Sequence, residues 1–281
     1  MAASLQLTNV LREFRETHPI QILQWGPHRW EYVCGGNQGI SILLAGGGGS
    51  TAESMFSINA ALEPFCRVVS VCIPTTASTV ADITLGIRAI LDALGIERTV
   101  LVGHSLGGLV VQSFAVYYPQ RVSGLVLSNT GFYLGLRAVL LPAVAGLMAE
   151  IPEALLLRMV TSQMARLLQS AEQPEFWLDF YRKELNQPGA GARIRHQMML
   201  MAKFARFFRQ NPIRSSLPWV QAVPVQIISS EDDRGFTKRE VAFLGQLYPK
   251  SQTLMLPKGS GHLTFLTRPQ EYVRSLREFL T

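Results

Sequence analysis

Cysteine is scarce in this sequence, and the cysteines present are not paired. The 281 residues include three of them, Cys34, Cys66 and Cys72, and no two have the CxxC or CxxxC spacing of a zinc site or a redox pair. So few cysteines also exclude the disulfide framework of a small secreted domain. We therefore expect reduced thiols, no metal site and a cytoplasmic protein.

Long hydrophobic runs are missing as well. The longest apolar tract, residues 132–148, is interrupted by Arg137 and Pro142. It is shorter than the roughly 20 residues that span a bilayer. The first residues of the chain lack the apolar stretch that a signal peptide needs. We expect no membrane span, and we interpret residues 132–148 as a lid or core helix.

Charged residues are few, and the positive excess is concentrated in one segment. Asp, Glu, Lys and Arg make up 16% of the residues, and the formal net charge is +6 at pH 7. Residues 131–216 contain eleven Lys and Arg but only six Asp and Glu. These charges are interleaved with Leu, Met and Phe, as on the solvated faces of helices, so we expect no nucleic-acid partner. Attraction to an anionic substrate or a membrane surface is the alternative interpretation.

What the sequence does contain is an alternation of short apolar runs with helical patterns. The runs that predict β-strands are 20–25, 29–34, 41–46, 67–74, 99–104, 124–129, 223–230 and 251–257. The segments that predict helices between and after them are 51–64, 79–95, 106–118, 238–248 and 269–280. Strands buried on both faces and separated by helices are typical of a parallel sheet, here with an antiparallel start because the first two runs are so close.

The alternation is interrupted once. After Asn129 about 85 residues pass with helical spacing and few β-branched runs, before a strand pattern returns at 223–230. We therefore predict an α/β fold in which residues 1–130 and 217–281 form the core and residues 131–216 form an inserted helical cap.

A G-x-S-x-G stretch, Gly103 to Gly107, lies where a strand pattern becomes a helix pattern. Such a turn raises Ser105 above the strand ends, and glycines on either side remove the clashes that a tight backbone would otherwise cause. The N–H of Leu106, at the start of the helix, is placed to donate to a developing oxyanion. Ser105 is the predicted nucleophile.

A serine needs a base, and the base needs an acid. Among five histidines, His262 is favoured because its glycine-bracketed loop follows the last strand, at the carboxyl edge of the sheet. The acidic loop after the strand at 223–230 offers Asp233, our choice, and Asp232, its competitor. An acidic loop that only caps the helix beginning near Thr237 is the alternative.

Four consecutive glycines, 46–49, come after the strand pattern ISILL at 40–44. No Lys follows at the P-loop spacing, which argues against a nucleotide site. If Ser105 is a nucleophile, this loop is expected to supply the second N–H of the oxyanion hole, and we assign that role to Gly47, because glycine lets the backbone approach the substrate closely.

Together these segments resemble the α/β-hydrolase superfamily over nearly the whole chain. The motifs are LLAGGGGS at 43–50, VLVGHSLGG at 100–108, IISSEDD at 227–233 and GSGHLTFLTRPQEYVRSLREFL at 259–280. The resemblance implies a triad of Ser105, Asp233 and His262, an oxyanion hole and a helical cap. It also implies that Gly46, Gly48 and His104 line the substrate site.

The expected activity is that of a serine esterase without metal or organic cofactor, acting on a small ester with an apolar acyl or aromatic part. Thioesterase, carbon–carbon bond hydrolase and cofactor-free perhydrolase activities stay open. Two features depart from the family: PTTASTVAD replaces its usual loop at 74–82, and LGQLYP at 244–249 is faintly similar to the maspardin branch. A non-catalytic binding protein is therefore the alternative, and the oligomeric state is left open.

Overall fold

The computed structural model describes the backbone of residues 2–281 and the side chains of residues 6–281. Across these residues eight strands form one sheet in the order β1-β2-β4-β3-β5-β6-β7-β8. The strands are β1 (Gln21–Trp25), β2 (His28–Gly35), β3 (Ser41–Ala45), β4 (Arg67–Cys72), β5 (Thr99–His104), β6 (Val122–Ser128), β7 (Val225–Ser230) and β8 (Gln252–Leu256). Strand β2 is antiparallel to both of its neighbours, and the pairs from β4 through β8 are parallel. The predicted mostly parallel sheet with an antiparallel start is confirmed.

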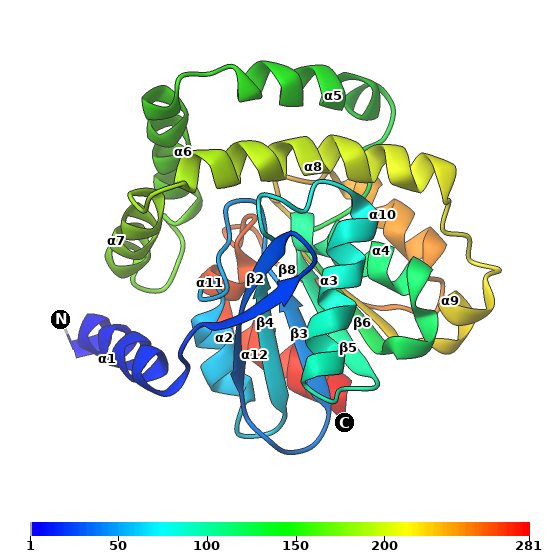
Figure 1. Ribbon diagram of the computed structural model, residues 1–281, viewed down its shortest axis with the longest axis horizontal. Helices are drawn as coiled ribbons and strands as arrows, with labels where there is room; N and C mark the ends of the chain where they lie inside the picture. Colours follow the sequence, from blue (N-terminus) through cyan, green and yellow to red (C-terminus); the bar gives the residue numbers. More distant parts are fainter. Residues whose placement is uncertain (1) are drawn as a thin grey trace.

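Helices lie on both faces of this sheet and above one end of it (Figure 1). They are α1 (Ala2–Thr17), α2 (Phe56–Leu62), α3 (Val80–Ala93), α4 (Leu106–Tyr117), α5 (Leu136–Ala149), α6 (Glu153–Leu167), α7 (Pro174–Leu185), α8 (Ala190–Gln210), α9 (Pro218–Ala222), α10 (Lys238–Leu247), α11 (Thr264–Thr267) and α12 (Pro269–Leu280). Two of them begin with capping boxes, at Thr79 with Asp82 and at Thr237 with Glu240. These boxes satisfy backbone N–H groups that the first turn of a helix leaves free.

The core divides into two halves because successive side chains of a strand point to opposite faces. On β5, Leu101 packs with residues of α3, α4 and α8 on one face. Its neighbours Val100 and Val102 pack with residues of α2 and α12 on the other. Burial on both faces is the reason that the central strands read as continuous apolar runs.

The segment between β6 and β7 carries α5 to α9, and in Figure 1 its helices α5 and α8 run above the sheet. Helix α8 is joined to loops of the sheet by side-chain hydrogen bonds. His196 Nε2 lies 2.9 Å from the Ala77 carbonyl oxygen, and Lys203 Nζ donates to the Ser78 carbonyl oxygen over 2.7 Å. No helix among the described residues is long and apolar enough to cross a bilayer.

Helix α1 is absent from the sequence-based predictions. Its Phe14 ring lies 6.0 Å from that of Phe56 on α2, which in turn lies 5.3 Å from Trp177 on α7. Arg15 adds an ion pair of 2.9 Å with Glu53, just before α2. Helix α1 therefore joins the sheet layer to the inserted helices through contacts with residues distant in sequence.

Candidate active site

Ser105 occupies a strained turn between β5 and α4. Its φ and ψ angles are 53° and −118°, a region that side chains other than glycine rarely adopt. Such strain costs on the order of 1–3 kcal/mol and persists only where surrounding contacts hold it. Here the Ser105 N–H donates to the Ser128 carbonyl over 2.9 Å, and the Thr130 hydroxyl donates to the Ser105 carbonyl over 2.7 Å.

The glycines beside Ser105 are required by close packing of the turn. A Cβ on Gly107 would lie 1.9 Å from the carbonyl oxygen of Ala45. A Cβ on Gly103 would lie 2.5 Å from the carbonyl oxygen of Gly107 and equally close to a methyl of Val111. Because both positions meet backbone atoms that cannot rotate away, the elbow geometry demands glycine on each side of the serine.

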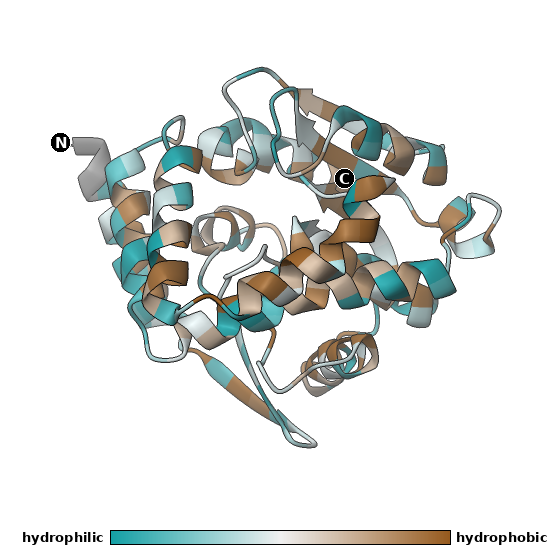
Figure 2. Cartoon of the chain, turned by 90° about the horizontal axis from the view of Figure 1, so that it is seen from above, coloured by the Kyte–Doolittle hydropathy of each residue, from teal (hydrophilic) through white to brown (hydrophobic). Residues whose placement is uncertain are grey.

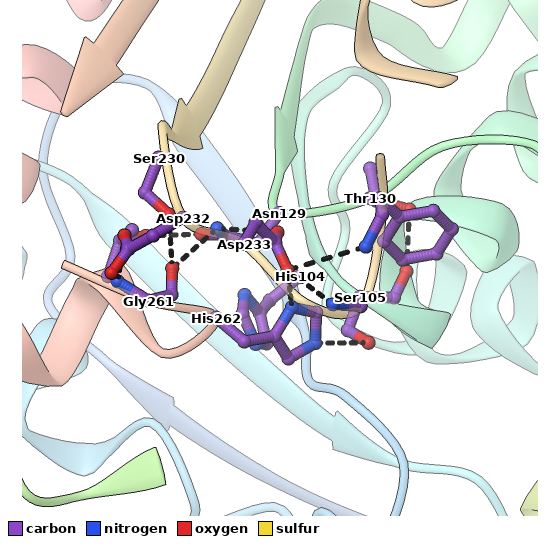
Figure 3. A network of polar contacts seen from close by, with 12 residues as sticks. His104, Ser105, Asn129, Thr130, Ser230, Asp232, Asp233, Gly261 and His262 are labelled. Atoms are coloured by element: carbon purple, nitrogen blue, oxygen red, sulfur yellow. Dashed lines mark hydrogen bonds and ion pairs between the residues drawn. The ribbon is translucent and has the colours of Figure 1, made fainter. Parts of the chain in front are cut away.

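The structure brings the three residues of the predicted triad together at the carboxyl edge of the sheet (Figure 3). His262 Nδ1 lies 2.8 Å from Asp233 Oδ1, and His262 Nε2 lies 3.0 Å from Ser105 Oγ. A carboxylate only accepts hydrogen bonds, so Nδ1 carries the proton. Nε2 is then free to accept the hydrogen bond of the Ser105 hydroxyl.

Asp233 is held as an anion although it is buried. Its side chain is 1% exposed, and burial by itself would raise its pKa. The hydrogen bond and charge of His262 outweigh this effect, helped by donation from the Asn129 amide over 2.9 Å and from the Gly235 N–H over 2.7 Å. The pKa of Asp233 therefore lies below its ordinary value.

Asp232, the competing acid, has a different set of partners. Its two carboxylate oxygens accept from the N–H of Gly259 at 2.8 Å and from the N–H of Gly261 at 3.0 Å. Burial opposes its ionisation, but these backbone donors outweigh burial and lower its pKa. Asp232 shapes the loop that carries His262, and Asp233 contacts the imidazole.

Asn129 is a residue that sequence reasoning missed. It follows β6 with a φ of 44°, a conformation that Asn tolerates better than most residues. Its amide donates to Asp233 and, over 3.3 Å, to the Gly261 carbonyl, and its Oδ1 accepts from the Thr264 hydroxyl. The signal available in the sequence was a polar Asn directly after a buried strand, at the edge where the other site residues are expected.

The glycine-rich loop lies beside Ser105. A Cβ on Gly47 would be 3.3 Å from Ser105 Cβ, whereas a Cβ on Gly48 would meet nothing within 4 Å and one on Gly46 would meet the Ser50 side chain. The N–H of Gly49 donates to the side chain of Gln197 on α8. This buried glutamine, also missed from the sequence, holds the loop from above.

His104, predicted at the substrate site, is buried beneath the turn. It is 2% exposed, and its ring centroid lies 5.2 Å from that of His262 and 4.9 Å from that of Phe265. Gly47 covers it, since a Cβ there would be 3.2 Å from His104 Cδ2. Burial, reinforced by the nearby charge of His262, lowers the pKa of His104 to about 3.

We expect replacement of His104 by Gln to reduce the acid sensitivity of the fold. Folded His104 stays neutral down to about pH 3, but in the unfolded chain a histidine binds a proton below about pH 6.5. Unfolding therefore takes up a proton in this range, and the stability that neutral His104 contributes is lost as the pH falls. Calorimetric Tm between pH 7 and pH 4 should fall less steeply for His104→Gln than for the wild type. Parallel curves would contradict this assignment.

A cavity of about 220 Å³ opens over the serine. Its lining residues come from both the sheet loops and the inserted helices: Ser105, Tyr133, Gln163, Leu167, Met201, Arg234, Gly235, Phe236 and His262. Tyr133 also borders a neighbouring apolar cavity of about 170 Å³. Burial raises the pKa of Tyr133 to about 12, so its hydroxyl stays protonated at neutral pH. Gly46, Gly48 and His104 are not among the lining residues of the cavity over Ser105.

A sequence model of the family described as alpha/beta hydrolase fold matches residues 45–269. The chain belongs to this alpha/beta hydrolase family. The match includes the elbow, the glycine-rich loop, the acidic loop and the histidine loop, and leaves α1 outside. In the described part of this family member, no group of three or more His, Cys, Asp or Glu side chains is arranged to hold a metal ion.

Known proteins similar to this alpha/beta hydrolase family member include hydrolases of several kinds. An uncharacterized protein of Mycobacterium bovis is 27% identical over 86% of this chain and 75% of its own length. A 2-hydroxy-6-oxononadienedioate/2-hydroxy-6-oxononatrienedioate hydrolase of Burkholderia vietnamiensis is 34% identical over 34% of this chain and 37% of its own. The structure of a thermophilic esterase from Thermogutta terrifontis has a TM-score of 0.72 at 18% identity, covering 94% of this chain and 97% of the esterase.

Proposed function

We propose that this protein is a serine hydrolase that cleaves small carboxylic esters through an acyl-enzyme. The observation that carries the proposal is the continuous hydrogen-bond chain from Ser105 through His262 to Asp233, with distances of 3.0 and 2.8 Å. A buried carboxylate that orients the imidazole and leaves Nε2 facing a serine hydroxyl is the arrangement that activates a serine nucleophile.

In the proposed reaction His262 Nε2 takes the proton of the Ser105 hydroxyl while Oγ attacks the ester carbonyl carbon. The resulting oxyanion accepts hydrogen bonds from the backbone N–H groups of Leu106 and Gly47. When the C–O bond breaks, the leaving alkoxide takes the proton from His262. Water then gives a proton to His262 and attacks the acyl carbon, and Ser105 recovers its proton as the carboxylic acid leaves. Asp233 stays ionised and stabilises the imidazolium in both halves.

The cavity walls support an apolar acyl or aromatic substrate. Tyr133, Leu167, Met201 and Phe236 supply apolar surface close to Ser105. Pockets of this kind bind mainly through apolar contact and use a few polar groups for orientation. Among the lining residues, Arg234 carries a permanent charge.

The proposal is tested with p-nitrophenyl esters of increasing acyl length and with a fluorophosphonate probe. We expect ester turnover, and a covalent probe adduct that peptide mass spectrometry locates at Ser105. A 2-hydroxy-6-oxo-dienoate belongs in the substrate panel because one relative carries such a compound in its name. Absence of both labelling and turnover would favour the non-catalytic binding protein instead.

We expect Gly47→Ala to lower kcat/KM for these esters by roughly 10- to 100-fold, because sub-ångström to ångström displacements of a catalytic group have effects of this size. The added methyl would lie 3.2 Å from His104 and 3.3 Å from Ser105 Cβ and would push the loop away from the serine. Gly48→Ala is the matched control, since a Cβ there meets nothing within 4 Å. Steady-state kinetics should give Gly48→Ala a kcat/KM close to that of the wild type. Equal losses of kcat/KM in the two variants would contradict the assignment of Gly47 to the oxyanion hole.

A further inference from the structure

Helix α5 presents an apolar side to the outside of the molecule. Its fourteen residues include one charged side chain, Arg137, and one buried residue, Ala145. The exposed large apolar side chains, with their exposed fractions, are Leu136 (70%), Val139 (70%), Leu140 (48%), Val144 (51%) and Leu147 (72%). We call these five residues the α5 outer face. Figure 2 views the molecule from above, with α5 near the viewer and mostly in the hydrophobic colour.

The opposite side of α5 already makes the contacts that hold this helix in the fold. Ala138 lines the apolar cavity that α5 shares with α8, and Met148 packs against the cluster of Leu156, Leu185 and Ile194. Arg137 fixes the beginning of the helix: it forms an ion pair with Glu240 and donates a hydrogen bond to the Gly235 carbonyl over 2.7 Å. A helix that is apolar on every side is ordinarily buried on every side. The α5 outer face is apolar and exposed, so it is available for contact with another surface.

Arginines lie on α6, the next helix along the chain, and beside the start of α5. On α6, Arg158 shares a face with the exposed Leu155, which precedes it by three residues. Arg239 borders a hollow beside Leu134 and Gly135, at the start of α5.

These two arginines are unpaired within the described residues. Neither Arg158 nor Arg239 forms an ion pair with a described carboxylate. Glu150 lies at the end of α5, and Glu153 is paired with Arg195 over 3.3 Å. The inserted segment as a whole is positively charged, with eleven basic and six acidic residues between 131 and 216.

We propose that the α5 outer face docks on an anionic lipid surface. An apolar helix face that lies in the membrane interface, flanked by Arg or Lys facing anionic headgroups, is a recognised mode of peripheral binding. A second copy of the chain fits less well, because face-to-face association would bring the same arginines of both copies together. This docking does not depend on the proposed catalytic activity.

The test is sedimentation of the full chain with vesicles of phosphatidylcholine alone and of phosphatidylcholine mixed with phosphatidylglycerol. We expect binding to the anionic vesicles, and weaker binding at high salt because headgroup attraction is screened. The variant Leu136→Gln/Leu140→Gln/Val144→Gln should bind the anionic vesicles weaker by roughly tenfold or more. Arg158→Gln/Arg239→Gln should lose roughly tenfold of the preference for anionic over neutral vesicles.

A matched control replaces exposed apolar residues elsewhere. Ile22 and Met255, exposed by 54% and 43%, lie on the edge strands β1 and β8, and Ile22→Gln/Met255→Gln should bind like the wild type. Circular dichroism and Tm establish that each variant is folded. Wild-type protein that stays in the supernatant, or a triple variant that binds undiminished, overturns the proposal. So does a wild-type dimer that the triple substitution converts to a monomer in light scattering, which would assign the face to a second copy.

Discussion

Ser105→Ala should lower kcat for p-nitrophenyl ester hydrolysis by at least about 10⁴-fold, the range seen when a triad nucleophile is removed. The alanine variant loses the oxygen that attacks the carbonyl carbon and the hydroxyl that lies 3.0 Å from His262 Nε2. Backbone N–H groups of the turn remain, so a small residual rate above that of water is expected. The ratio of the two kcat values is measured with freshly purified wild type and Ser105→Ala.

The control for this substitution is Ser78→Ala, because Ser78 lies exposed in the loop before α3. Its rate should equal that of the wild type. Fluorophosphonate labelling should disappear in Ser105→Ala and persist in Ser78→Ala. Equal ester turnover by Ser105→Ala and the wild type would exclude the acyl-enzyme mechanism.

Asp233→Asn should lower kcat by roughly 10³- to 10⁴-fold, because an amide in this place favours the wrong tautomer of the histidine. The Asn side chain is able to turn its NH₂ toward His262 Nδ1, which then becomes an acceptor and directs its proton to Nε2. Nε2 would donate toward Ser105 and not accept its proton. Steady-state kinetics above pH 7 should show the loss in kcat, with little change in the far-ultraviolet circular dichroism.

Asp232→Asn separates the two adjacent acids. Asp232 accepts from two backbone N–H groups of the histidine loop, at 2.8 and 3.0 Å, and an amide cannot accept with both of its ends. Loss of such a bond to a charged group costs about 1.5–3 kcal/mol, so we expect a lower Tm and a far smaller loss of kcat than for Asp233→Asn. A reversed order of the two kcat effects would assign the orienting acid to Asp232.

The polar groups around Asp233 make its anionic form compatible with burial. Asn129 joins Asp233, the Gly261 carbonyl and Thr264 through one side chain, so the acid loop, the histidine loop and the end of β6 are held in one arrangement. Each of these groups would be expensive to bury without a partner. The same hydrogen bonds that stabilise the charge also set the direction in which the imidazole points.

Several features were determined by the sequence alone because they depend on short-range patterns. Apolar runs of six to eight residues correspond to β1 through β8. The central strands among them are buried on both faces, which needs only local apolar composition. The elbow was readable because G-x-S-x-G is itself a short pattern, although the contact that requires Gly107 comes from Ala45 on the neighbouring strand β3. The family also followed from motifs that are each local.

Other features were decided only by the tertiary structure. Asn129 meets Asp233 across 104 positions of sequence, and Gln197 meets Gly49 across 148. Neither pairing leaves a local pattern, because polar side chains acquire a partner only when the chain folds. The choice between Asp233 and Asp232 likewise depends on which of two neighbouring carboxylates the loop turns toward the imidazole. The apolar tract at 132–148 was visible in the sequence, but only the packing of α5 on α8 decided which of its side chains are covered and which face outward.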